Sequence, residues 1–385
     1  MRGRTVTFAR SRYGRIALFL GVVVLVQLLT AVADKPFFLT QLTMAAYYTL
    51  VTAGLSLLMG YAGQISLGHA AFFAIGGYAS GYLTTVDLAS SRSASLVALG
   101  ERLHLLVPRV DLYGGEALSF HPWAAFVLAI ALALAVAWLV GVPVLKLKGH
   151  YLAMATLGFG TIVYSVLLAS QRLGAADGLG SVPPFPLLGG LAVGGGRAGR
   201  VANYYVAWVV VALALLVLSN LIQSRVGRAL RAIHGAEDAA ASMGVDVARY
   251  KLRTFVLSAA LAAVGGSLLT HFNAGIGPGE AGVMKSVRYV AIVAVGGMGS
   301  LWGTVATSAV LTFLSLRGYF GTLDDAVFGG VLILVMLFSP DGVLRLDARG
   351  AVAAIRARLT PLPASPREPG GGAAEEKHRS KGVAR

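Results

Sequence analysis

The sequence predicts an all-α polytopic integral membrane protein with about eight to ten transmembrane helices, some of them short or broken. Of its 385 residues, 56% are hydrophobic and only 13% are charged, whereas soluble domains carry about 25% charged residues. Uncharged runs such as 123–145 and 203–223 exceed the ~20 residues that cross a ~30 Å hydrocarbon core. The apolar segment 60–83 also contains six glycines together with Gln64, Ser66 and His69. Polar side chains at membrane depth face a cavity or another helix rather than lipid, so we expect an internal path rather than a simple anchor.

Apolar runs separated by breaking residues give the candidate crossings in order. They are 16–33, 41–59, 69–86, 122–145, 151–170, 204–222 and 252–272, followed by the less regular segments 286–299, 300–316 and 326–339. Residues 87–121 are expected to form a polar loop, and residues 223–251 a charged one. Counting 286–299 as one short or broken crossing gives ten, and eight or nine crossings fit the sequence as well.

The basic residues are unevenly distributed along the chain. Most of the 32 lysines and arginines lie in 1–15, 146–148, 225–253 and 341–385, which one topology places on the same side. Basic residues mark the cytoplasmic side of a membrane protein. We therefore expect both termini in the cytoplasm and no nucleic-acid partner. The expected organisation is a basic N-terminus (1–15), a transmembrane domain (16–345) and a disordered basic tail (346–385).

The first apolar run admits two interpretations. Arginines, an apolar stretch and Ala31-Val32-Ala33 resemble a signal peptide with its cleavage site. The apolar stretch is about 18 residues long, which exceeds the usual signal-peptide core. We therefore favour an uncleaved first span.

Glycines and polar residues inside the apolar segments mark candidate breaks in the helices. Broken helices at membrane depth expose backbone groups that can line a path for polar solutes. His69 is expected to be a hydrogen-bonding or cavity group, because no acidic residue or second histidine accompanies it as a metal ligand would require. Thr156 and Gly158, with Gly160 and Thr161, would form a second such region. Helix packing is the competing interpretation, because glycine is frequent in transmembrane helices. The candidate path residues are Gly60, Tyr61, Gly63, Gln64, Ser66, Gly68, His69, Thr156, Gly158, Gly296, Gly297 and Gly299.

The charged insert between the sixth and seventh crossings contains two short helical patterns. Residues 224–233 are amphipathic and end before Gly235. In the second pattern, Glu237 and Asp238 stand at a helix N-terminus and Gly244 where a C-cap belongs. The alanines between them would allow close docking against another protein, although an ordinary cytoplasmic loop would have a similar pattern.

These motifs and several longer blocks carry a resemblance to a known family. Asp238-Ala239-Ala240, three residues and Gly244 are similar to the Glu-Ala-Ala-x-x-x-Gly loop of ABC-importer permeases, with Asp in place of the leading Glu. Residues 54–78, 147–159, 227–250, 296–303 and 329–343 resemble the branched-chain amino acid ABC permeases of the LivM type. The likeness extends in order over residues 40–345.

The resemblance implies a transport subunit, not an enzyme, that translocates branched-chain or other aliphatic amino acids across the bacterial cytoplasmic membrane. The implied partners are a LivH-type second permease subunit, two ABC ATPase subunits, a periplasmic or extracellular solute-binding protein and the lipid bilayer. ATP would be used by the ATPases, since this chain has no Gly-x-x-x-x-Gly-Lys-Ser/Thr loop, and no metal or cofactor is expected on it. The residues expected to couple to the ATPases are Arg225, Arg228, Arg231, Glu237, Asp238, Ala239, Ala240 and Gly244.

The substrate is left open by one departure from the family pattern. Where the family commonly has an acid before Gly-Gly-x-Gly, this chain has Arg288, with Lys285 nearby. ABC permeases for urea or short amides share the general pattern and form the alternative. An ion-coupled secondary transporter is less favoured, because such proteins use a titrating carboxylate at membrane depth and the spans between 16 and 222 offer none.

Overall fold

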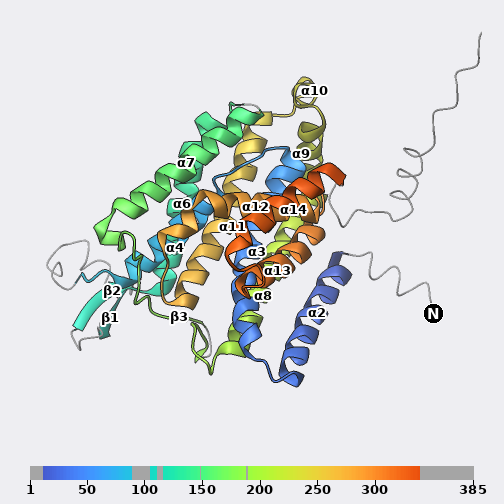
Figure 1. Cartoon of the computed structure of the whole chain (residues 1–385). Helices are drawn as coiled ribbons and strands as arrows, with labels where there is room; N and C mark the ends of the chain where they lie inside the picture. Colours follow the sequence, from blue (N-terminus) through green and yellow to red (C-terminus); the bar gives the residue numbers. More distant parts are fainter. Residues whose placement is uncertain (1–11, 89–104, 111–115, 148, 188–189, 339–385) are drawn as a thin grey trace, which may run out of the picture. The chain divides into compact units, whose positions relative to one another are not determined.

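The protein is described by a computed structural model that covers residues 12–88, 105–110, 116–147, 149–187 and 190–338. Helices dominate these residues, and two short hairpins supply their strands (Figure 1). The prediction of an all-α polytopic fold is confirmed. Most of the predicted basic N-terminus, Lys148, the end of the 329–343 block and the predicted tail 346–385 lie outside the described residues.

Six helices of the described residues are long and apolar enough to cross a bilayer. They are α2 (Arg12–Val32), α3 (Phe37–Ala62), α6 (Pro122–Val144), α7 (His150–Ala169), α8 (Arg200–Gln223) and α11 (Val247–Asn273). The other predicted crossings contain shorter helices: α4 (His69–Thr85), α12 (Val283–Gly296), α13 (Leu301–Leu316) and α14 (Asp324–Phe338). The expectation that some elements are short is therefore correct.

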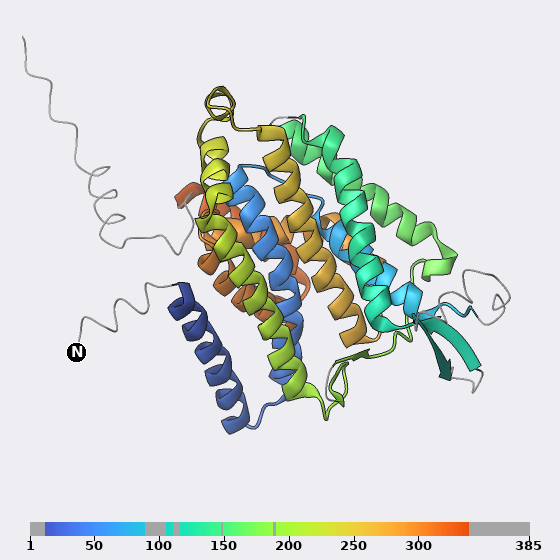
Figure 2. The ribbon, with the colours of Figure 1, turned by 180° about the vertical axis from the view of Figure 1, so that it is seen from behind.

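Helices α3 and α11 form the centre, and α2, α6 and α7 lie outside them. Seen from behind, α8, α3, α11 and α6 stand side by side (Figure 2). Helix α6 buries one face made of small residues four apart: Ala125, Ala129, Ala133, Ala137 and Gly141. Its opposite face exposes Trp138 and Leu139, which suits contact with lipid or with another membrane subunit.

Helices α4 and α11 approach each other closely because both carry small residues where they meet. A Cβ atom on Gly76 of α4 would collide with the backbone of Ala263. A Cβ atom on Gly266 of α11 would collide with the carbonyl group of Phe73. Small residues at such contacts let the two helix backbones touch, and this close van der Waals packing holds helices together in a membrane.

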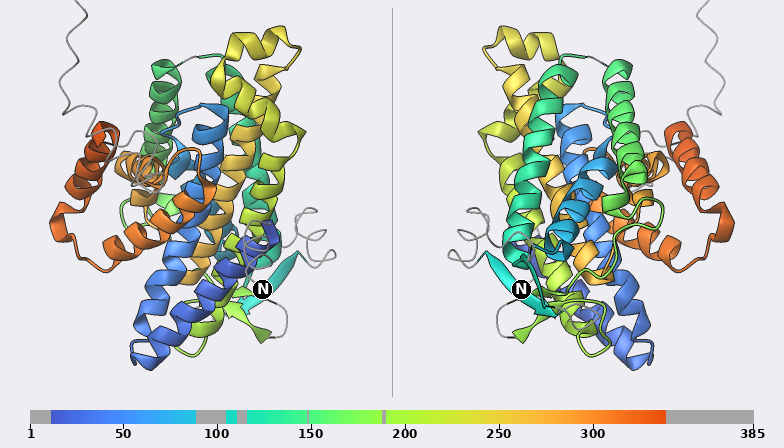
Figure 3. Two further views of the ribbon diagram at one scale, coloured as in Figure 1. Left: turned by 90° about the vertical axis from the view of Figure 1, so that its right-hand side faces the viewer. Right: turned by 90° about the vertical axis from the view of Figure 1, so that its left-hand side faces the viewer.

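Helices α12, α13 and α14 gather on one side of the long helices (Figure 3). Helix α13 packs on α3, and α12 packs on both α13 and α14. Helix α12 is preceded by a short 3₁₀ helix, η4 (Pro278–Ala281), that packs against α4 and α7. This group brings residues near 280–300 against the centre of the bundle.

The two ends of the bundle differ in structure. Strands β1 (Leu106–Val110) and β2 (Glu116–Phe120) pair antiparallel, and β3 (Phe185–Pro186) pairs with β4 (Ala192–Val193). They lie at the end opposite α9 (Arg225–Gly235) and α10 (Glu237–Ser242), as Figures 1 and 2 show. The expected polar loop 87–121 thus contains a hairpin. Its strands are too short and too mixed in polarity for the sequence alone to reveal them.

Candidate functional site

The break predicted around residues 60–69 meets the end of the short or broken crossing predicted at 286–299. Helix α3 ends at Ala62, Gly63 takes the left-handed conformation at φ 67°, and α4 begins at His69. Helix α12 ends at Gly296, and α13 begins at Leu301. The Tyr61 hydroxyl donates a hydrogen bond of 3.1 Å to the Gly299 carbonyl.

The contact between these breaks is tight. A Cβ atom on Gly60 would collide with the carbonyl group of Met298. A Cβ atom on Gly296 would lie 2.5 Å from Cα of Thr304, and Gly297 has φ 90°. We call this region the glycine junction: residues 60–68 together with 296–299.

Buried hydrogen bonds fix the end of the glycine junction where α4 begins. His69 is fully buried; its Nδ1 lies 3.0 Å from Ser66 Oγ and its Nε2 lies 2.8 Å from Ser258 Oγ on α11. Gln64 is also buried, and its amide atoms have no hydrogen-bond partner among the described residues. No group of three or more His, Asp and Glu side chains that could hold a metal occurs in the described part of the chain. His69 therefore joins the junction to α11 through neutral hydroxyl groups.

Helix α7 reaches the junction through Thr156. The Leu67 amide donates to Thr156 Oγ1 at 3.0 Å, and a Cβ atom on Gly68 would lie 2.7 Å from the Thr156 carbonyl oxygen. The predicted break around Gly158 and Gly160 is wrong, because α7 is continuous from His150 to Ala169. A glycine alone does not break a helix in a membrane, where the backbone groups it frees find no water. A Cβ atom on Gly158 would meet nothing within 4 Å.

The histidine contact gives a first prediction. Ser258→Ala should lower the free energy of unfolding by about 1–3 kcal/mol, because one nitrogen of buried His69 loses its hydrogen-bond partner. Thermal unfolding in detergent measures the change. Ser242→Ala is the control, since the Ser242 hydroxyl makes an exposed bond to the Asp238 carbonyl. Equal stability of the two variants would contradict a structural role for His69.

Helix α9 is amphipathic, as its sequence pattern predicted. The Ser224 hydroxyl caps it by accepting a hydrogen bond of 3.1 Å from the Val226 amide. One face buries Gly227, Leu230 and Ile233 against the bundle, and Arg225, Arg228 and Arg231 are exposed. His234 lies against the glycine junction, because a Cβ atom on Gly63 would be 2.9 Å from its Nδ1.

Helix α10 is short and sharply ended. The Gly244 amide bonds to the Ala241 carbonyl and the Val245 amide to the Ala240 carbonyl. With Gly244 at φ 82°, these bonds form a Schellman motif. Asp238 and Ala239 are exposed and Ala240 is buried. Glu237 pairs at 2.6 Å with Lys251 of α11, whose side chain is only 7% exposed. Of the predicted coupling residues, Glu237 thus contacts the bundle directly.

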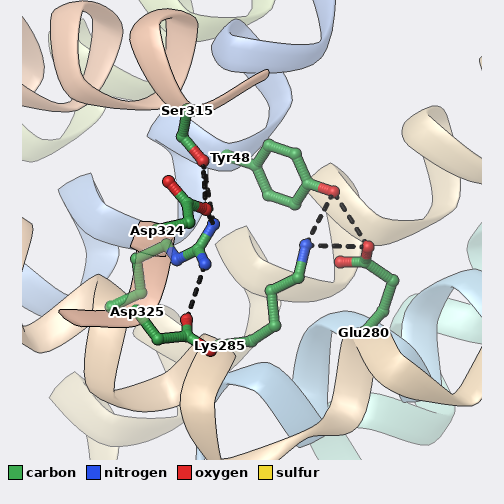
Figure 4. A network of polar contacts seen from close by, with 7 residues as sticks. Tyr48, Glu280, Lys285, Ser315, Asp324 and Asp325 are labelled. Carbon is green, nitrogen blue, oxygen red and sulfur yellow. Dashed lines mark hydrogen bonds and ion pairs between the residues drawn. The ribbon is translucent and has the colours of Figure 1, made fainter. Parts of the chain in front are cut away.

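A cluster of charged side chains was not predicted as a site. Lys285 Nζ lies 3.0 Å from Glu280 Oε1, to which the Tyr48 hydroxyl donates a hydrogen bond of 3.0 Å (Figure 4). The Lys285 ammonium group also lies 4.9 Å from the centre of the Tyr48 ring. We call Tyr48, Glu280 and Lys285 the charged triad.

Beside the charged triad, Arg288 joins α12 to α14. Its guanidinium group pairs with Asp324 at 2.7 Å and Asp325 at 2.8 Å, and donates to the Ser315 hydroxyl at 3.0 Å. The cation at this position, where the resemblance led us to expect an acid, is therefore paired with two carboxylates of α14. This pairing explains how a positive charge is accommodated at this position.

The charged triad lies halfway along the bundle. Tyr48 is in the middle of α3, and Ala281, next to Glu280, packs in one cluster with Ala74 and Tyr78 from the middle of α4. The sequence did not indicate this position, because Glu280 directly follows Gly277-Pro278-Gly279, a segment typical of a surface loop. The one available signal was the pair Lys285 and Arg288, three residues apart beside an apolar run.

The helical architecture and these sites define a multi-pass membrane protein. The chain belongs to the family described as branched-chain amino acid transport system, permease component, which matches residues 37–336. The resemblance noted in the sequence is thereby confirmed. The family consists of transport permeases, so the chain is a transport subunit and not an enzyme.

Individual relatives agree with this family. The chain is 31% identical to the high-affinity branched-chain amino acid transport system permease protein LivM of Escherichia coli K12, over 83% of this chain and 74% of LivM. It is 28% identical to LivH of the same organism, over 80% of this chain and 96% of LivH. It is 26% identical to BraD of Pseudomonas aeruginosa, over 79% of this chain and 93% of BraD. No solved structure matches. Similarity to both LivM and LivH indicates a system with two permeases.

Proposed function

We propose that this chain is the LivM-type subunit of an ATP-driven importer of branched-chain amino acids in a bacterial cytoplasmic membrane. It would pair with a LivH-type permease, two ABC ATPase subunits and an external solute-binding protein. The names of the relatives support the substrate class. Residues 16–345 would form the permease domain, with both termini in the cytoplasm.

The observation that carries the mechanism is the α9–α10 segment. It presents three exposed arginines at one end of the bundle, opposite the β hairpins. It is also attached to the bundle twice, through the buried face of α9 and through the Glu237–Lys251 ion pair. A segment that is exposed on one side and held on the other can transmit a movement of an ATPase to the spanning helices.

The glycine junction is the first place that such a movement would reach. His234 of α9 faces Gly63, and the junction then contacts α7 through Thr156 and α11 through His69. We propose that the candidate path residues in this junction act by allowing these helices to shift against each other. Close backbone contacts support this role, because a small displacement there must move both partners.

The test is uptake by the whole complex reconstituted in vesicles. The wild-type complex should take up L-leucine only with ATP inside, and should take up urea and acetamide poorly. Arg228→Glu with Arg231→Glu should reduce leucine uptake at least about tenfold, because each reversal replaces an attractive contact by a repulsive one. The same variant should also lose the stimulation of ATP hydrolysis by the substrate-loaded binding protein.

The matched control is Arg172→Glu, which reverses an exposed arginine on the 3₁₀ turn after α7. Its uptake should stay near the wild-type rate. Normal uptake and stimulation in the Arg228/Arg231 variant would remove the coupling role of α9. ATP-driven uptake of urea without leucine uptake would overturn the proposed substrate.

A further inference from the structure

The charged triad has unused hydrogen-bonding capacity at the middle of the bundle. Glu280 Oε1 accepts bonds from Tyr48 and Lys285, but its buried Oε2 has no partner among the described residues. The hydroxyl groups of Tyr78 and Tyr289 are likewise buried without a partner in the described part of the chain. Both residues are at least nine-tenths buried.

The two tyrosines lie close to the triad. The Tyr289 ring centre is 6.3 Å from that of Tyr48, and Tyr78 packs in the same apolar cluster as Ala281. Buried polar atoms are nearly always satisfied by protein, water or ligand. Three unsatisfied oxygens around one ion pair therefore indicate a binding site for a polar ligand.

The ion pair itself is reachable and electrically balanced. The side chains of Glu280 and Lys285 are 20% and 28% exposed, so the pair is not sealed in the core. One negative and one positive charge sit on facing side chains. A guest with a single charge would leave one of them unpaired at membrane depth, which is costly.

A zwitterion meets this constraint. Its ammonium group can bond to Glu280 while its carboxylate bonds to the Lys285 ammonium group, so that every charge keeps an opposite partner. The exchange replaces one ion pair by two and leaves the net charge of the site unchanged. A neutral amide such as urea offers no charge to either side chain.

We infer that Tyr48, Glu280 and Lys285 form a binding site for the ammonium and carboxylate groups of an α-amino acid as it crosses the bundle. The inference rests on the proposed function and extends it to residues outside the predicted path. The charge of Arg288 is already paired, because Asp324, Asp325 and Ser315 hold its two terminal nitrogens. The apolar residues Ala74 and Ala281 beside the triad suit an aliphatic side chain.

The experiment measures uptake of radiolabelled L-leucine by the reconstituted complex. Lys285→Met and Glu280→Gln should each reduce it at least about tenfold, because each leaves one charge of the bound zwitterion unpaired. The exchanged pair, Glu280→Lys with Lys285→Glu, should recover much of the uptake, because it restores both charges in reverse order. Asp246→Asn is the matched control: it removes a carboxylate whose side chain is 47% exposed and which pairs with Arg249 rather than with the triad. Asparagine still caps α11, so uptake should stay near the wild-type rate.

The outcomes separate this inference from the proposed function. Amounts of assembled complex and ATP hydrolysis stimulated by the loaded binding protein show whether each variant folds and couples. If Lys285→Met and Glu280→Gln take up leucine at the wild-type rate, the charged triad is not a binding site, and the proposed function is unaffected. Absence of leucine uptake by the wild-type complex would overturn the proposed function itself. An exchanged pair as inactive as the single variants, although assembled and coupled, would count against the zwitterion model.

Discussion

Lys251→Met should disconnect α10 from the bundle and reduce uptake about tenfold. A loss of about 1.4 kcal/mol in the free energy that couples α10 to the bundle is enough for this change. The substitution keeps most of the apolar volume of Lys251 and removes its ammonium group, which lies 2.6 Å from Glu237. The Glu237 side chain is 32% exposed, so the freed carboxylate can turn to water. We therefore expect loss of coupling to exceed loss of stability. Uptake, stimulated ATP hydrolysis and thermal unfolding of one preparation measure the three quantities.

The nearby pair Arg249–Asp246 supplies the control. Its side chains are 76% and 47% exposed, and such pairs contribute about 0–1 kcal/mol. Arg249→Ala should therefore leave uptake close to that of the wild type. Restored uptake in the exchanged pair Glu237→Lys with Lys251→Glu would show that the ion pair itself is required. Full coupling in Lys251→Met would refute the transmission route through α10.

The ion pair illustrates what the sequence could and could not predict. The acids at the start of α10 and Gly244 at its end were readable, because helix capping depends on neighbouring residues. The partner of Glu237 was not readable, because Lys251 follows it by fourteen residues across a turn between helices. A pairing between two elements depends on how they pack, which local patterns do not encode.

The same distinction holds for the membrane helices. All ten predicted apolar segments contain helices, since a long apolar run is the main sequence signal of a helix that crosses a bilayer. The break after Gly63 was also readable, because polar residues surround the glycines there. At Gly158 the same reasoning predicted a break that does not exist, because Gly158 and Gly160 remain inside the continuous helix α7.

The charged triad is the clearest omission. Tyr48 and Glu280 are 232 residues apart, and neither stands in a pattern that indicates chemistry. Only the path of the chain after α11, which folds back against α4 through η4, brings them together. Long-range polar contacts of this kind become visible only in three dimensions.

Gly60→Ala should produce the largest effect of any single methyl group added to a glycine of the described residues, because its Cβ atom would make the closest contact among them. The new Cβ atom would occupy the position of the Met298 carbonyl group, and the atoms nearest to it are backbone atoms of Met298 and Gly299, which cannot move aside as the end of a side chain can. Overpacking of a rigid contact costs about 1–3 kcal/mol. We expect reduced thermal stability and loss of uptake, because the two breaks of the glycine junction would be forced apart.

Gly158→Ala is the matched control for this change. It adds the same methyl group to a helical glycine of α7, where nothing lies within 4 Å. It should keep wild-type uptake and, because alanine favours helix more than glycine does, lose no stability. Both variants are compared by leucine uptake and by thermal unfolding of the purified complex. Normal uptake in Gly60→Ala would mean that the two breaks can separate without consequence, and the glycine junction would then be no more than a packing contact.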